Sequence, residues 1–130
     1  MKYLCLGYHD EKLWQAQSAS ERNALMDDTF AYADYLKTNR HILDDHALQE
    51  ISQAATLRFE SGKCSVTDGP FAETKEQMGG IMIIEANDLN HAIQLMSKMP
   101  CMRMGGSIEI RPINEAIKFN TENSRAVATA

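Results

Sequence analysis

Acidic and basic side chains gather in the run Val-Thr-Asp-Gly-Pro-Phe-Ala-Glu-Thr-Lys-Glu-Gln-Met-Gly-Gly, residues 66–80. Asp68 and Glu73 are carboxylates that could remove a proton from a small molecule, and Lys75 could hold an anionic group of the same molecule. These three are the candidate catalytic residues. Each also has a structural explanation, because Asp at a turn accepts backbone N–H groups and mixed charges are common on solvated surfaces.

A second group of candidate residues lies near the start of the chain, with one member near its end. Tyr8 and Trp14 could form the walls of a small apolar pocket, although packing explains them equally well. His9 and Asp10 could bind polar groups of a ligand. The candidate ligand-binding residues are Tyr8, His9, Asp10, Trp14 and Arg111.

The histidines and cysteines give no metal-ligand spacing. His9 and Asp10 could meet His46 at one rim of a sheet, as a pH-sensitive or metal-binding site, but the spacing does not support a metal there. We therefore predict no metal and no cofactor. The three cysteines are odd in number and form no C-x-x-C motif, which favours reduced thiols and a cytoplasmic location.

Composition and charge exclude several classes of protein. The chain has 130 residues, of which 44% are hydrophobic, and this suits one soluble domain with a modest core. Its net charge of −5 makes direct binding of nucleic acid unexpected. No apolar run is long enough to span a membrane, and the opening apolar run is too short for a signal peptide.

Hydrophobic periodicity and turn residues predict the elements that position these side chains. Ser18 and Glu21 match a capping box at the start of a helix, Ser61-Gly62 favours a hairpin turn, and Pro100 is expected to end a second helix. A polar loop is expected at residues 9–12. The predicted strands cover residues 2–8, 42–48, 55–60, 63–67, 80–85 and 107–112. The predicted helices cover residues 18–39 and, from a cap at either Asn87 or Asp88, residues up to about 99.

This order of elements predicts an α+β fold: a ferredoxin-like split βαβ arrangement with an inserted β-hairpin. Residues 1–118 would form the domain, and residues 119–130, which are small and polar, a disordered tail. Strands 2–8 and 80–85 are apolar on both faces, whereas two helices can cover only one face. We therefore predict a homodimer in which a second copy covers the other face.

The run at residues 66–80 resembles the signature of the DGPF-type branch of YCII-related proteins. The resemblance extends from Lys2 to Ile113 and includes Gly-Gly-Ser-Ile-Glu-Ile-Arg-Pro-Ile from Gly105. It implies a dimeric α/β barrel of ferredoxin-like subunits, and an association of some members with extracytoplasmic-function sigma factors. Some members are proposed enzymes with a His/Asp dyad. Here the first helix starts without His, and Met99 precedes Pro100 where that dyad has Asp.

Three functions follow from these observations. We favour a small-molecule-binding or regulatory module that holds a small anionic ligand and contacts a protein partner in transcription regulation. The alternative is an enzyme of isomerase or lyase type, in which Asp68 or Glu73 is the base and Lys75 or Arg111 holds the anion. In the third, the 68–80 loop is a structural clasp at the dimer interface.

Overall fold

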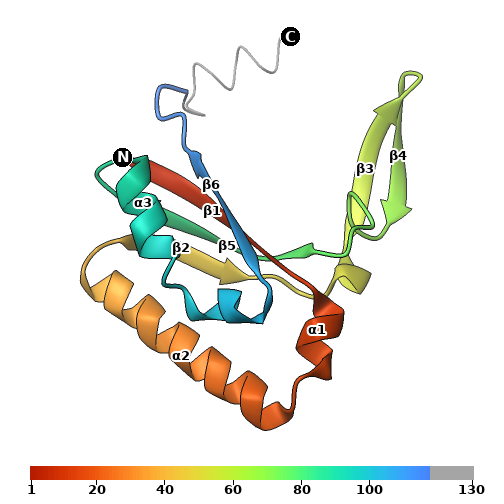
Figure 1. Ribbon diagram of the computed structural model, residues 1–130. Helices are drawn as coiled ribbons and strands as arrows, with labels where there is room; N and C mark the ends of the chain where they lie inside the picture. The colour runs from red at the N-terminus through yellow and green to blue at the C-terminus, as the bar shows by residue number, and fades with distance from the viewer. Residues whose placement is uncertain (118–130) are drawn as a thin grey trace.

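The computed structural model describes residues 1–117, which form two antiparallel sheets and the helices that accompany them (Figure 1). The main sheet has four strands in the order β2-β5-β1-β6: β1 (Lys2–His9), β2 (Ile42–Ala47), β5 (Gln77–Glu85) and β6 (Ser107–Pro112). The second sheet contains only β3 (Ala55–Glu60) and β4 (Lys63–Asp68). The α-helices are α1 (Glu11–Ala16), α2 (Ala19–Thr38) and α3 (Leu89–Met96), and two short 3-10 helices are η1 (Ile51–Gln53) and η2 (Pro100–Met104).

The strand order of the main sheet confirms the predicted ferredoxin-like arrangement with an inserted hairpin. All three pairings in this sheet are antiparallel, and β1 lies between β5 and β6. The predicted tail at residues 119–130 lies outside the described residues. Within residues 1–117, no helix combines the length and apolar character needed to cross a membrane.

Side-chain caps fix where the helices begin. The Ser18 hydroxyl accepts a hydrogen bond from the Glu21 backbone N–H at 3.0 Å, which confirms the predicted start of α2. Asp88 caps α3 in the same way, through the His91 N–H at 2.8 Å.

Three boundary predictions are wrong. Strand β5 begins at Gln77 rather than at residue 80, so the predicted loop before it is shorter. The segment expected as a polar loop at residues 9–12 begins α1, because the Asp10 carboxylate caps the backbone of that short helix. Helix α3 ends at Met96 rather than Met99, and Pro100 opens η2 instead of only stopping a helix. Proline suits this position because the first turn of a helix needs no N–H from it.

The core lies between the main sheet and helices α2 and α3. Tyr3 of β1 is paired with Ile84 of β5, and both side chains are buried in the same cluster as Leu36 of α2 and Met96 of α3. Since members from both helices join one cluster, the two helices cover the same face of the sheet. This face is the covered face.

The opposite face of the sheet also has an apolar centre. Leu4 is paired with Ile83 and Leu6 with Ile81, and because the pleat alternates, these four half-buried side chains point away from the helices. Polar pairs lie along the outer strands: Asp44 contacts His46 on β2, and Glu109 forms an ion pair with Arg111 on β6. We call this surface the uncovered face, since helices α2 and α3 lie on the other side.

Strands β3 and β4 form a hairpin that we call the arm (residues 55–68). Its turn confirms the Ser61-Gly62 prediction, because both residues have left-handed backbone angles, with φ of 51° and 76°. The arm's strands pair with each other and not with the main sheet. Figure 1 shows the arm rising from the end of the main sheet, on the side away from α2.

The buried thiol of Cys5 gives the fold a testable pH dependence. Burial raises the pKa of the Cys5 thiol from its ordinary value of 9.0 to about 11. Between these values the unfolded state loses the proton and the native state keeps it, so stability falls as the pH rises.

We expect Cys5 to lower the free energy of unfolding by up to about 1.4 kcal/mol for each pH unit between pH 9 and 11. Urea denaturation of the wild type and of Cys5→Ala would measure this, because the substitution removes the thiol and leaves the other titrating groups. The stability advantage of the wild type should shrink across the window. An advantage that does not change with pH would contradict the assignment.

Candidate functional site

Two adjoining clefts lie at the rim of the main sheet where β1 ends and β5 begins. One has a volume of about 450 Å³ and the other of about 820 Å³. Tyr8, Thr74 and Glu76 line both, so these residues form a shared wall. Volumes in this range suit a small organic ligand.

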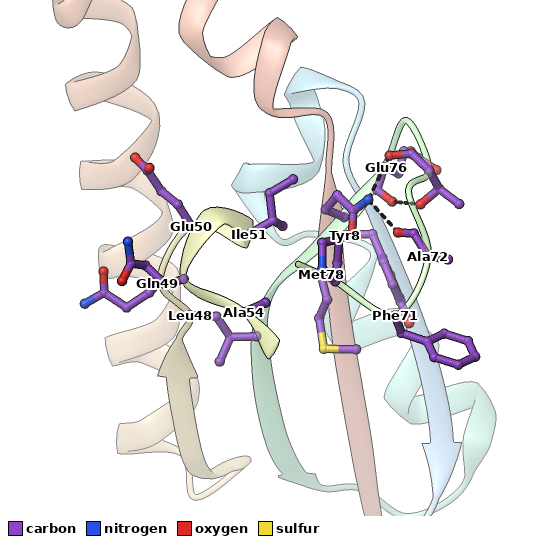
Figure 2. A pocket seen from close by; sticks show the side chains of 14 residues that line it. Tyr8, Leu48, Gln49, Glu50, Ile51, Ala54, Phe71, Ala72, Glu76 and Met78 are labelled. Carbon is purple, nitrogen blue, oxygen red and sulfur yellow. Dashed lines mark hydrogen bonds between the residues drawn. The ribbon is translucent and has the colours of Figure 1, made fainter. Parts of the chain in front are cut away.

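The smaller cleft, called here the apolar cleft, is lined mainly by hydrocarbon and aromatic side chains. Leu48 and Ile51 come from the segment after β2, and Met78 comes from β5. Figure 2 shows Leu48 and Ile51 on one side of the cleft, with Tyr8 and Met78 on the other. This arrangement can hold an apolar ring or chain between the two sides.

The larger cleft, called here the polar cleft, contains the carboxylate of Asp10 and the ammonium of Lys75. Asp10 is only 6% exposed, and its Oδ1 accepts hydrogen bonds from the Lys12 N–H at 2.9 Å and the Leu13 N–H at 3.4 Å. Its other oxygen lies 4.0 Å from Lys75 Nζ, whereas the Lys75 side chain is 83% exposed. A fixed carboxylate therefore faces a cation that is free to turn toward a ligand.

Glu76 links the loop before β5 to the start of β6. The Ser107 hydroxyl donates a hydrogen bond to Glu76 Oε1 at 3.2 Å, and both residues line the polar cleft. The Glu76 backbone carbonyl accepts a hydrogen bond from the Thr74 hydroxyl. These contacts hold the loop against β6 and use part of the hydrogen-bonding capacity of Glu76.

Gln77 holds the same loop together through its side chain. Its side chain is buried, and its amide nitrogen donates to the carbonyl oxygens of Ala72 and Thr74, both at 2.9 Å (Figure 2). One buried amide thus closes the loop that carries Lys75. Sequence reasoning gave Gln77 no role, because a glutamine gives no sign of whether its side chain is buried.

A bulge in β5 sets the pairing of Tyr8 with Met78, two residues that line the apolar cleft. Gly7 pairs with Gly80 and Tyr8 with Met78, so Gly79 is an extra residue in β5. A Cβ atom on Gly79 would lie 2.4 Å from the His9 imidazole, which shows that the ring rests against the bulge backbone. Glycine permits this close approach.

The structure brings together three of the candidate residues predicted from sequence. Tyr8, Asp10 and Lys75 line the polar cleft. Asp68 and Glu73 are exposed and line neither cleft; Asp68 is the last residue of β4 and belongs to the arm.

The remaining candidates also lie outside the two clefts. His9 rests on Gly79, and half-buried Trp14 belongs to α1. Arg111 lies on β6 with its Nε 3.7 Å from Glu109 Oε2. His46 is paired with Asp44 on β2 rather than with Asp10. Among residues 1–117, no group of three or more His, Cys, Asp or Glu side chains is placed to hold a metal ion.

Several lining residues were not identified from sequence. The sequence does indicate the position of Ser107, because this residue follows Gly105-Gly106 and opens a strand that pairs with β1. The sequence does not indicate that Leu48, Ile51 and Met78 line a cleft, since apolar side chains are equally common in a core.

A family model described as YCII-related domain matches residues 1–117. An uncharacterised protein of Rhizobium meliloti (strain 1021) is 34% identical over 114 residues, which cover 87% of this chain and 92% of that protein.

Among solved structures, a 5-chloro-2-hydroxyhydroquinone dehydrochlorinase from Burkholderia phenoliruptrix AC1100, in complex with 2,5-dihydroxybenzoquinone, matches with a TM-score of 0.43 and 16% identity. The match covers 91% of this chain and 100% of that one. A likeness at this TM-score carries no argument about activity.

The role of Gln77 in ordering the loop can be measured by hydrogen exchange. In Gln77→Ala, the carbonyl groups of Ala72 and Thr74 lose their donor, and we expect the free energy of unfolding to fall by about 1–3 kcal/mol. Backbone amides at residues 71–76 should exchange faster, while those of β1 change little. Gln53→Ala, at an exposed lining position, is the control. Equal exchange in both variants would contradict this role.

Proposed function

Because the chain belongs to the family of YCII-related domains, we propose that it is a small-molecule-binding module whose ligand lies across the apolar and polar clefts. The observation that carries the proposal is the pairing of the buried Asp10 carboxylate with the exposed Lys75 ammonium beside an apolar wall. A binding site of this type combines a largely apolar surface with a few convergent polar groups.

The two clefts define the chemical class of the ligand. An apolar or aromatic body fits between Leu48, Ile51 and Met78, and a carboxylate on that body would be held by Lys75. Asp10 is acceptor-only when ionised, so it would accept a hydrogen bond from a hydroxyl group on the ligand. The class is therefore a small aromatic or alicyclic hydroxy acid.

We also propose that two copies of this chain associate as a homodimer and form a dimeric α/β barrel. The apolar centre of the uncovered face, with Leu4, Leu6, Ile81 and Ile83, supports it, because a two-fold axis would place this face against its copy. Each pair of charged residues along the outer strands would then meet the partner's rim, where water can still reach it.

A regulatory role is also part of the proposal. The run at residues 66–80 supports membership of the DGPF-type branch, and with it a protein partner in sigma-factor regulation. The net charge of −5 favours contact with protein over contact with DNA. In this role, an occupied site would alter the surface that the partner contacts.

A second candidate function is an isomerase or lyase that works by proton transfer. Its supporting observation is the orientation of Asp10, which is held by two backbone N–H groups while its second oxygen faces the polar cleft. For this function we propose Asp10 as the base in place of Asp68 or Glu73, since Asp10 lines the polar cleft and the other two line neither cleft. Deuterium incorporation from heavy water into a bound hydroxy acid would distinguish turnover from binding.

Thermal-shift titrations with benzoate, 4-hydroxybenzoate and neutral benzamide would test the ligand class. We expect the two acids to raise the melting temperature and benzamide to have little effect. Lys75→Ala should weaken binding of the acids about tenfold or more, by removing a charge-assisted contact. Asp10→Asn should reduce the preference for 4-hydroxybenzoate while preserving the cap of α1, because Asn also caps helices.

Lys63→Ala is the matched control, since Lys63 lies on the arm and outside both clefts. Two results would contradict the proposed site: no acid stabilises the wild type, or Lys75→Ala and Lys63→Ala bind the acids equally well.

A further inference from the structure

The arm has one apolar face and one polar face. Leu57 is paired with Val66 and Phe59 with Cys64, and residues directly opposite in a hairpin share a face. Exposed fractions in the single chain are 66% for Leu57, 76% for Phe59 and 67% for Val66. The other face carries polar residues: Thr56 and Thr67, Arg58 and Ser65, and Glu60 and Lys63.

This apolar face needs a covering surface. An isolated two-stranded hairpin is marginally stable in water, and contiguous exposed apolar side chains mark an interaction site. Polar side-chain contacts join the arm to the residues that directly follow it. Thr56 donates a hydrogen bond to the Gly69 carbonyl, and Arg58 donates one to the Phe71 carbonyl while its guanidinium lies over the Phe71 ring. They do not cover Leu57, Phe59 or Val66.

We propose that the arm clasps a second copy of this chain, with the apolar face carrying Leu57, Phe59, Cys64 and Val66 packed against the partner. The proposal rests on the homodimer proposed above and identifies the element that completes its interface. In a two-fold dimer each arm contacts the other copy, so both arms are buried by one symmetry operation.

The surface area that a stable dimer must bury favours a second copy of this chain as the partner of the arm's apolar face. A stable interface covers about 800 Å² on each partner. The apolar side chains at the centre of the uncovered face are already half-buried by their neighbours in the sheet and offer only part of that area. Each large exposed side chain of the arm, such as Phe59, could bury roughly 100–200 Å² of apolar surface. This area would add to the apolar area of the uncovered face.

The direction of the arm supports the same occupant. It extends beyond the main sheet on the side away from α2, which is the side of the uncovered face (Figure 1). A copy docked on the uncovered face would therefore come within reach of the arm.

Sedimentation equilibrium on the full chain tests the clasp. The double variant Leu57→Thr and Phe59→Thr removes the apolar anchors but keeps β-forming residues in β3. We expect the dimer dissociation constant to rise about 30-fold or more, as for removal of central anchors. The control, Glu60→Thr with Lys63→Thr, changes an opposed pair on the polar face and should stay close to the wild type.

The thiol of Cys64 gives a second readout that needs no substitution. Cys64 and Cys101 are exposed in the single chain, and of these two only Cys64 lies on the apolar face of the arm, whereas burial raises the pKa of the Cys5 thiol and makes it less reactive. Alkylation of Cys64 by iodoacetamide should slow several-fold as the protein concentration passes through the dimer dissociation constant. In the Leu57→Thr and Phe59→Thr variant, a higher protein concentration should be needed before alkylation of Cys64 slows.

The outcomes separate the clasp from the proposals on which it rests. A double variant that dimerises like the wild type, with unchanged Cys64 protection, overturns the clasp and leaves the homodimer in place. A wild type that stays monomeric at micromolar concentration overturns both. Ligand binding is measured separately by the thermal-shift titrations, so a failure there leaves the clasp unaffected.

Discussion

The pairing of β1 with β5 is the constraint on which the rest of this structure depends. It aligns Tyr3 with Ile84 at the centre of the core, and at its other end it brings His9 opposite Gln77. The end of β1 thus lies next to the loop that precedes β5. The extra residue at Gly79 shifts the register at this end, so that Tyr8 is paired with Met78 and forms the wall shared by the two clefts.

The sheet and the site were not equally predictable from sequence. Alternation and apolar runs located the strands, and Ser18 and Ser61-Gly62 identified a helix start and a hairpin turn, because caps and tight turns depend on local residues. The roles of Asp68 and Asp10 depend on tertiary placement instead. A turn signature cannot tell that Asp68 ends an exposed arm, and a six-residue helix such as α1 is too short to show periodicity.

The site is positioned by contacts both within the 66–80 run and outside it. Asp10 is positioned by its role as a cap of α1, and the loop carrying Lys75 is closed by Gln77 and joined to β6 through Ser107. In the proposed site the fixed carboxylate and the exposed ammonium would have different functions. The first would orient a ligand, and the second would capture it.

A double-mutant cycle on 4-hydroxybenzoate binding tests most directly whether Asp10 and Lys75 form one site. Calorimetry on the wild type, Asp10→Asn, Lys75→Ala and the double variant would give the coupling between the two positions. Because their charged atoms lie 4.0 Å apart and would hold the same ligand, we expect a coupling of about 0.5–3 kcal/mol. Additive effects of the two substitutions, or no binding to the wild type, would contradict a shared site.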